Sequence, residues 1–344
     1  MGRAFSRILA LVLALCVWTA FTPLAVLASE GDVCKIVETE TGYSTLDEAL
    51  AAFETGQTIQ LLGNINYSGG IVITDKTVTF DLNGYNLNVV NPAEGDSPEA
   101  TSGLCVIGQD GNAGLTLLGE GEFNVTGTLY GVYVQAYPEK TASATVTNAT
   151  ATAADTDDAW GCGAYAGGEN ATITVLEDAT ATGAGGNGAT GNSLGSVTVK
   201  GNVIAIAENG FEDEYGWYRA AVEAWDDGEV VVEGHVTATG DNSIGVLAAG
   251  SCVTVLGDVT GVVGGVFAYV SSGVEIGGKV TSTDESGFGV LAVDNCEIEV
   301  GGDVVAGGIG VEIMDTWDSS PSEILIDGAI TAPVYIKIGE AVLG

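Results

Sequence analysis

Short aliphatic runs with polar residues at every second position return at regular intervals along the second half of the chain. In each repeat an aliphatic–x–aliphatic run ends at glycine, and a Gly–aliphatic–x–Ala run follows, as in Val253–Gly257 and Gly265–Ala268. Alternation with a step of two indicates strands with one apolar face. The glycines that close the first runs are Gly201, Gly234, Gly257, Gly278, Gly302 and Gly328. Self-similarity at this spacing is typical of a solenoid.

We therefore predict an all-β solenoid in which each repeat is one coil. Related strand pairs occur earlier, for example the runs that end Gly131-Val-Tyr-Val134 and Gly163-Ala-Tyr-Ala166. No linker or change of composition interrupts the pattern, so residues 57–344 are expected to form one domain of about ten to twelve coils.

A short amphipathic helix is predicted at Tyr43–Phe53. Ser44 or Thr45 can cap it, and Glu48 stands three residues after Thr45, as in a capping box. Its apolar face consists of Leu46, Ala49, Leu50 and Phe53. Since a solenoid exposes its core at each end, this helix, within an N-terminal segment of residues 29–56, is expected to cap the first coil.

Residues 1–28 have the pattern of a bacterial Sec signal peptide. Arg3 and Arg7 precede an apolar stretch from Ile8 to Leu27, and Ala28 closes a small-residue cleavage site. Export to the cell surface or the medium is therefore expected. No other apolar stretch is long enough to span a membrane, so no transmembrane segment is predicted after cleavage.

The chain is strongly acidic, with 46 Asp and Glu residues against 9 Lys and Arg and a formal net charge of −37. This charge disfavours nucleic acid as a partner. Two interpretations stay open: the carboxylates solvate the surface, or some of them bind cations.

Five cysteines follow the leader, and two of them, Cys252 and Cys296, stand four residues after the alanine that ends a Gly–aliphatic–x–Ala strand. Ser272 has the same place between them, so the three residues are predicted to share one site on successive coils. Two coils separate strands by roughly 9.6 Å, which exceeds the reach of a disulfide. We expect Cys252 and Cys296 to be buried, small apolar residues that are not linked to each other.

The chain resembles the pectin-lyase-like right-handed parallel β-helix proteins, in particular exported bacterial surface proteins of the adhesin-like type. The resemblance rests on the opening Tyr43-Ser-Thr-Leu-Asp-Glu-Ala-Leu-Ala-Ala, on Gly56-Gln-Thr-Ile-Gln-Leu-Leu-Gly63, on Lys76-Thr-Val-Thr-Phe-Asp-Leu-Asn-Gly84 and on the later coils. It implies an elongated, right-handed, three-faced solenoid. It transfers no activity, because one fold carries many functions.

The catalytic sets of enzymes with this fold are incomplete here. Polygalacturonase-type members combine carboxylate pairs with Gly-His-Gly and Arg-Ile-Lys; this chain has Asp pairs, but its only histidine, His235, matches an outward turn position. Lyase-like members need a basic residue beside a calcium site, and Arg219 is the single arginine after the leader. We therefore assign no catalytic residue and expect a binding protein rather than an enzyme.

The candidate ligand-binding residues lie in acidic, aromatic insertions that precede two Gly–aliphatic–x–Ala strands, and in the corner that follows the second of them. Aromatic rings pack on sugar rings while carboxylates accept hydroxyl hydrogen bonds, and clustered carboxylates also suit Ca²⁺; the alternative is that the rings pack on the coils and the acids are solvated. The candidates are Asp157, Asp158, Trp160, Asp213, Glu214, Trp217, Tyr218, Trp225, Asp226 and Asp227.

The expected function is that of an exported bacterial β-helix that acts as a binding or scaffold protein for extracellular glycans or other cell-surface components. The alternative is a polysaccharide lyase or glycoside hydrolase. Calcium is the one cofactor that the acidic insertions suggest, and no metal-ligand set can be assigned. Any sugar or calcium site is expected on the face that carries the insertions rather than on the regular coils after Val230.

Overall fold

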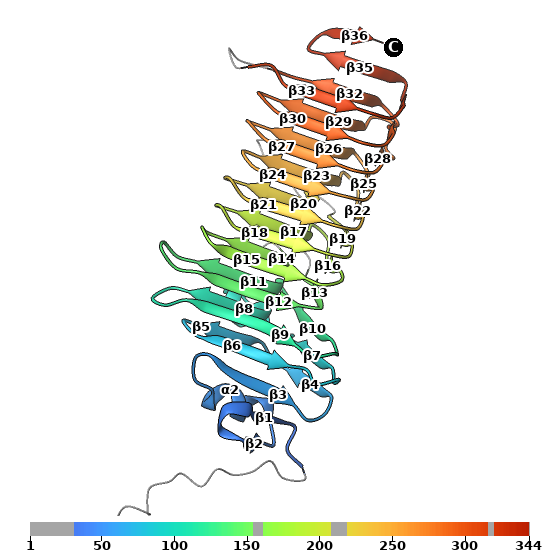
Figure 1. Ribbon diagram of the computed structural model, residues 1–344. Coiled ribbons are helices and arrows are strands. Elements are labelled where there is room, and N and C mark those ends of the chain that lie inside the picture. Colours follow the sequence, from blue (N-terminus) through green and yellow to red (C-terminus); the bar gives the residue numbers. More distant parts are fainter. Residues whose placement is uncertain (1–30, 154–160, 208–218, 316–319, 344) are drawn as a thin grey trace, which may run out of the picture.

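The computed structural model describes residues 31–153, 161–207, 219–315 and 320–343, and it shows an elongated right-handed parallel β-helix (Figure 1). The predicted leader, residues 1–28, lies outside the described residues. Within the described ranges, no helix has the length and apolar character needed to cross a membrane.

Three long sheets, named A, B and C, form the faces of the solenoid, and each coil contributes one strand to each of them. Sheet A has 13 strands in the order β2 (Thr41–Tyr43), β1 (Cys34–Ile36), β3 (Gln57–Leu61), β6 (Thr77–Asp81), β9 (Ala113–Leu118), β12 (Ala142–Val146), β15 (Ala171–Val175), β18 (Ser196–Val199), β21 (Glu229–Val232), β24 (Cys252–Val255), β27 (Gly273–Ile276), β30 (Glu297–Val300) and β33 (Glu323–Ile326).

Sheet B has 11 strands, one per coil, so the described chain forms 11 coils, within the predicted range. They are β4 (Ile65–Ser68), β7 (Leu87–Val90), β10 (Phe123–Gly127), β13 (Asn148–Ala151), β16 (Ala179–Ala181), β19 (Val203–Ala205), β22 (Val236–Ala238), β25 (Val259–Gly261), β28 (Val280–Ser282), β31 (Val304–Val305) and β34 (Ile330–Thr331).

Sheet C has 12 strands, of which the last pairs antiparallel with its neighbour. They are β5 (Ile71–Thr74), β8 (Ser102–Gly108), β11 (Tyr130–Ala136), β14 (Cys162–Gly167), β17 (Asn187–Asn192), β20 (Ala220–Trp225), β23 (Ile244–Ala249), β26 (Gly264–Tyr269), β29 (Phe288–Val293), β32 (Ile309–Ile313), β35 (Val334–Ile338) and β36 (Ala341–Leu343).

The core is built from in-register aliphatic ladders, as the alternation predicts. Val253 aligns with Val274 and then with Ile298, and the next inward position repeats the pattern in the same three strands. All six of these side chains are buried: Val253, Val255, Val274, Ile276, Ile298 and Val300. Because the side chains alternate between faces, the intervening residues point outward.

The glycines that open the Gly–aliphatic–x–Ala strands leave room for atoms of the next coil. A Cβ on Gly265 would overlap Cγ1 of Val280 in β28, and a Cβ on Gly289 would overlap Cγ1 of Val304 in β31. These glycines therefore allow sheet C to approach sheet B of the next coil closely.

The N-terminal cap is confirmed. Helix α2 (Leu46–Ala52) begins after Thr45, whose hydroxyl accepts a hydrogen bond from the Glu48 amide at 3.3 Å. It buries Leu46 and Ala49, with Phe53 immediately after the helix, in the hydrophobic core. The helix lies beside β1 at the N-terminal end of the solenoid (Figure 1). A 3₁₀ turn, η1 (Val37–Thr39), and strands β1 and β2 complete this end, and helix α3 (Pro98–Thr101) interrupts the path from β7 to β8.

The C-terminal end is covered only in part. Strand β36 folds back and pairs antiparallel with β35, so it forms the edge of sheet C at this end. Strands β33 and β34 are the edge strands of sheets A and B. Inward residues of this last coil, such as Ile324 and Ile326, are only partly buried, whereas the matching Ile298 and Val300 are fully buried.

Candidate functional site

A ladder of side chains on the outer face of sheet C forms the base of the candidate site. Tyr133, Tyr165, Thr190 and Glu223 occupy the same register position on four successive strands, β11, β14, β17 and β20. In-register parallel pairing places equivalent side chains above one another, so the two tyrosine rings stack with centroids 5.1 Å apart and planes at 3°. Tyr130 closes one side, with its ring edge-on to both, at 5.0 and 5.8 Å.

A cleft opens where this aromatic ladder is interrupted. Thr190 follows Tyr165 and is too small to continue the stack, so a cavity of about 170 Å³ remains; we call it the sheet C cleft. Its walls come from helix α3 and from strands β11, β14, β17 and β20. The lining residues are Pro98, Tyr130, Tyr133, Cys162, Tyr165, Asn187, Thr190, Asn192, Glu223 and Trp225.

The cleft carries a buried polar atom without a partner. Asn187 is 2% exposed, and its Oδ1 accepts no hydrogen bond from the described part of the chain. A buried acceptor without a partner costs free energy. Around it, Asn192 Nδ2 donates to the Tyr165 hydroxyl at 3.1 Å, and the Cys162 thiol donates to Thr190 Oγ1 at 3.4 Å. The cleft thus presents an acceptor to a ligand that donates.

Glu223 lines the cleft and is 2% exposed. Its Oε1 accepts a hydrogen bond from the Ala220 amide at 3.2 Å, and its Oε2 accepts one from the Trp225 indole at 3.1 Å. The Asn187 side chain also acts on the carboxyl and lowers its pKa. Glu223 therefore fixes the orientation of the Trp225 ring, which lines the cleft.

Burial raises the pKa of the Glu223 carboxyl above its ordinary value, although the charge of Arg219 and the hydrogen bonds act in the opposite direction. Burial also raises the pKa of the Tyr130 and Tyr133 hydroxyls, and it raises the pKa of the Cys162 thiol to about 12. The phenols and the thiol are therefore uncharged at neutral pH, and Cys162 is not an activated nucleophile.

The raised pKa of Glu223 predicts a pH dependence of stability. A carboxyl whose pKa is higher in the folded state contributes stability that is fully present below the unfolded pKa, ordinarily near 4.5, and that is lost as the pH rises through the folded pKa. Glu223→Gln removes this titration. The free energy of unfolding of the variant minus that of the parent should therefore increase as the pH rises from 4.5 to 8, as measured by urea unfolding; a constant or falling difference would contradict the assignment.

Of the ten sequence-predicted site residues, Trp225, Asp226 and Asp227 lie in the described part, and only Trp225 lines the cleft. Asp226 and Asp227 are exposed in the turn after β20, with left-handed φ values of 50° and 60°. The other seven lie outside the described residues: Asp157, Asp158, Trp160, Asp213, Glu214, Trp217 and Tyr218. Their segments precede β14 and β20, both of which contribute to the cleft.

Calcium stays a prediction. Among the described residues, no three His, Cys, Asp or Glu side chains gather closely enough to hold a metal ion. The acidic insertions on which the calcium hypothesis rests fall within the ranges that are not described.

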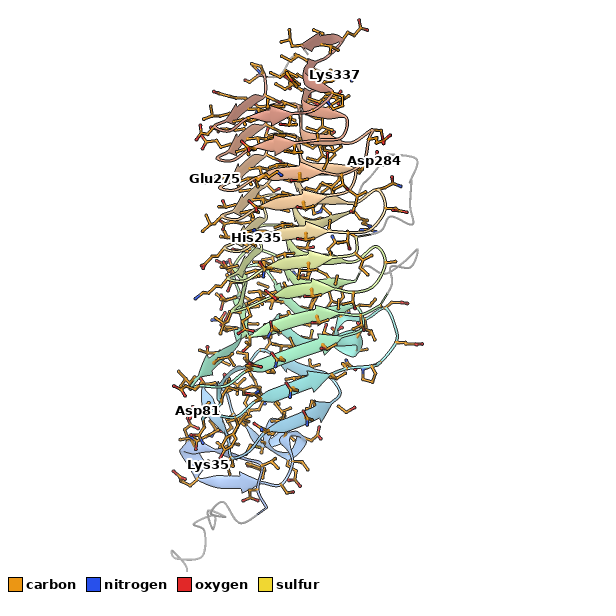
Figure 2. All side chains as sticks on the ribbon, turned by 90° about the vertical axis from the view of Figure 1, so that its right-hand side faces the viewer. Lys35, Asp81, His235, Glu275, Asp284 and Lys337 are labelled. Atoms are coloured by element: carbon orange, nitrogen blue, oxygen red, sulfur yellow. The ribbon has the colours of Figure 1, made fainter. Side chains whose placement is uncertain are left out.

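His235 occupies the outward turn position that its sequence context predicts, and its side chain is 60% exposed (Figure 2). The same position in successive coils forms a ladder in which a side chain accepts a hydrogen bond from the backbone of the next coil. Asn202 Oδ1 accepts from the His235 amide at 3.0 Å, His235 Nδ1 accepts from the Asp258 amide at 2.9 Å, and Asp258 Oδ1 accepts from the Lys279 amide at 2.8 Å. His235 thus has a structural role in a turn.

The cysteine alignment requires a correction. Cys252 and Cys296 are both free, as predicted, and Cys296 is buried, but Cys252 is exposed. Cys252 aligns with Gly273 and then with Glu297, rather than with Ser272 and Cys296. The residue equivalent to Ser272 and Cys296 is Ser251. The Ser251 carbonyl accepts a hydrogen bond from the amide of Gly273, the residue after Ser272, and the Ser272 carbonyl accepts one from the amide of Glu297, the residue after Cys296. The prediction that Cys252 is a buried apolar residue is therefore wrong.

The aromatic ladder itself was not predicted as a site. Its residues occupy the x position of each Gly–aliphatic–x–Ala strand, for example Tyr133 in Gly131-Val-Tyr-Val134. Comparing that position from one coil to the next is the sequence signal that identifies the ladder.

The fold and the cleft define the class of this protein: a right-handed parallel β-helix with an aromatic cleft on one lateral face. Compared with known protein families, curated proteins and solved structures, the chain matches none of them.

Proposed function

We propose that this chain is an exported bacterial β-helix, at the cell surface or secreted, that binds extracellular saccharides in the sheet C cleft and acts as an adhesin-like binding or scaffold protein. The supporting observation is the cleft, in which stacked tyrosines and Trp225 surround a buried acceptor, Asn187 Oδ1, that has no partner within the described chain. Aromatic walls with a few placed polar groups are typical of small-molecule sites.

Export is supported by the leader pattern of residues 1–28, in which a basic start precedes an apolar stretch. The resemblance to pectin-lyase-like surface proteins, carried by residues 43–52, 56–63 and 76–84, agrees with that location.

Binding is favoured over hydrolysis by the carboxyl groups of the cleft. Glycoside hydrolases use two carboxyl groups about 5 to 9.5 Å apart. Among the described residues that line the cleft, Glu223 is the one acid, and its oxygens already accept hydrogen bonds from Ala220 and Trp225. The enzyme alternative would need a second acid from the insertions, such as Asp157 or Asp213.

The test starts from the purified exported chain and a glycan array, followed by titration of each hit with tryptophan fluorescence as the signal. Tyr165→Ala removes the ring that ends the stack, and its affinity should fall about two- to tenfold, because an aromatic contact contributes about 0.5–1.5 kcal/mol. Tyr335→Ala is the control: Tyr335 is 50% exposed on β35, far from the cleft in the coil order, and its loss should leave affinity unchanged.

Thermal melting of both variants separates a binding defect from unfolding. If the array gives no hit, or if Tyr165→Ala binds each hit as the parent does while remaining folded, saccharide binding in this cleft is wrong. Measurement of reducing ends released from bound polysaccharides tests the enzyme alternative.

A further inference from the structure

We infer that the sheet C cleft holds one uncharged pyranose ring, which takes the place of the missing aromatic rung above Thr190 and donates a hydroxyl hydrogen bond to Asn187 Oδ1. This inference rests on the proposed function and specifies its ligand.

The stacking geometry supports a ring at this position. Tyr133 and Tyr165 stack at 5.1 Å with planes at 3°, which is close to the distance of about 4.8 Å between neighbouring strands. The next rung is Thr190, so strand β17 does not continue the stack with an aromatic ring on that face of Tyr165. A ring that lies on this face over Thr190 continues the stack at the spacing that the coils impose.

The volume of the cleft limits the ligand to about one ring. At about 30 Å³ for each water molecule, 170 Å³ has room for five or six waters. Sites for larger ligands occupy about 300–1,000 Å³. A longer glycan would therefore place one residue in the cleft and leave the rest outside it.

The acceptor atom of Asn187 favours a ligand that carries a hydrogen-bond donor. Its side chain is 2% exposed, and its Oδ1 has no hydrogen-bond partner within the described residues. A hydroxyl that donates to this atom satisfies a buried acceptor, whereas a ligand with only acceptors or apolar groups at this point leaves it unsatisfied. Pyranose rings carry hydroxyl donors around their edge.

The charges of the cleft select against acidic sugars. Glu223 is the single carboxylic acid among the described lining residues, and those residues include no Lys or Arg. The nearby cation, Arg219, already interacts with Glu223. A uronate carboxylate would thus enter a buried site without a free counter-charge, in a chain whose net charge is −37, which is unfavourable.

The experiment compares matched pairs of ligands on the purified exported chain by calorimetric titration. Methyl glucoside and methyl galactoside are paired with methyl glucuronide and methyl galacturonide. At least one neutral member should bind at least about tenfold more tightly than its uronide, as expected when a buried charge is left unpaired.

Thr190→Tyr places an aromatic side chain of the protein at the position that the ligand ring is proposed to occupy. The new ring should continue the Tyr133–Tyr165 stack and fill the cleft, so binding of the neutral glycoside should be lost while the melting temperature is kept. Thr254→Tyr introduces the same side chain at an outward position of β24 in sheet A and should bind as the parent does. Thr190→Leu is the smaller replacement if the tyrosine variant does not fold, and it should weaken binding.

The outcomes separate the inference from the proposed function. If a uronide binds as tightly as its neutral partner, the ligand class is wrong while saccharide binding stands. If a folded Thr190→Tyr or Thr190→Leu variant binds as the parent does, the ring does not lie over Thr190. If no saccharide of either class binds, the proposed function fails as well.

Discussion

Replacing Phe123 by alanine is expected to destabilise the protein by about 3–5 kcal/mol, the usual cost of truncating a buried phenylalanine. Phe123 is fully buried on β10 of sheet B, and its ring packs edge-on against Phe80 on β6 of sheet A, with centroids 5.5 Å apart. The inward residues of the next coil on sheets A and B are small, so they fill little of the cavity; they are Ala142, Ala144, Val146, Ala149 and Ala151. Urea unfolding followed by circular dichroism measures the loss.

The loss of stability caused by Phe123→Ala should also be confined to the coils near the substitution. Each coil of a solenoid contacts only its neighbours, so the defect should reach the adjoining coils and fade along the axis. Amide hydrogen exchange should therefore accelerate in β6 and β10 and change little in β29 and β32. Leu118→Ala is the control, because Leu118 is 54% exposed on neighbouring β9, and its free energy of unfolding should change by no more than about 0.5 kcal/mol. Uniform acceleration along the chain would contradict this description.

The repeating core could be predicted because it depends on the alternation of residues within each strand and on the stacking of neighbouring coils. Once a strand has one apolar face, period-two alternation decides which residues enter the core, and in-register stacking brings Val253, Val274 and Ile298 together. The glycines of these strands are visible in the sequence, whereas the close approach of Gly265 and Gly289 to a valine of the next coil is not.

The turns between strands could not be predicted in the same way, and Cys252 shows why. The turn before β24 contains one left-handed residue, Gly250, whereas the turn before β27 contains two, Val270 and Ser271, and that before β30 also contains two. The first turn is therefore one residue shorter. Counting a fixed number of residues from the preceding alanine shifts the register by one and moves Cys252 to the wrong face.

The cleft escaped prediction because its residues are unremarkable within any one strand. Tyr165 and Thr190 are ordinary outward strand residues, and the hollow exists only because one follows the other in the stack. Their separation along the chain varies with the turns, so the ladder becomes visible once strand register is known. The acidic, aromatic insertions predicted as sites, such as that around Asp157, lie outside the described residues. Trp225 connects the predicted site with the cleft, because it follows one of these insertions in the chain and also lines the cleft.

Glu223→Leu is expected to destabilise the protein by about 2–4 kcal/mol at pH 7, because it leaves two donors without an acceptor at about 1–3 kcal/mol for each buried one. The donors are the Ala220 amide and the Trp225 indole. The free energy that the parent spends on burying a carboxyl opposes this loss but does not cancel it, since the leucine cannot accept any of these hydrogen bonds. Urea unfolding at pH 7 measures the difference.

Glu223→Gln is the matched variant, because its amide keeps one acceptor oxygen and nearly the same shape. It should lose less stability than Glu223→Leu at every pH. Trp225 and Asn187 both line the cleft, so the leucine variant should also change the Trp225 environment, seen as a shift in fluorescence relative to a Trp225→Phe reference. If Glu223→Leu is as stable as the parent and leaves this signal unchanged, the hydrogen bonds to Glu223 do not maintain the shape of the cleft. The packing of Tyr130, Tyr133 and Tyr165 must then maintain that shape alone.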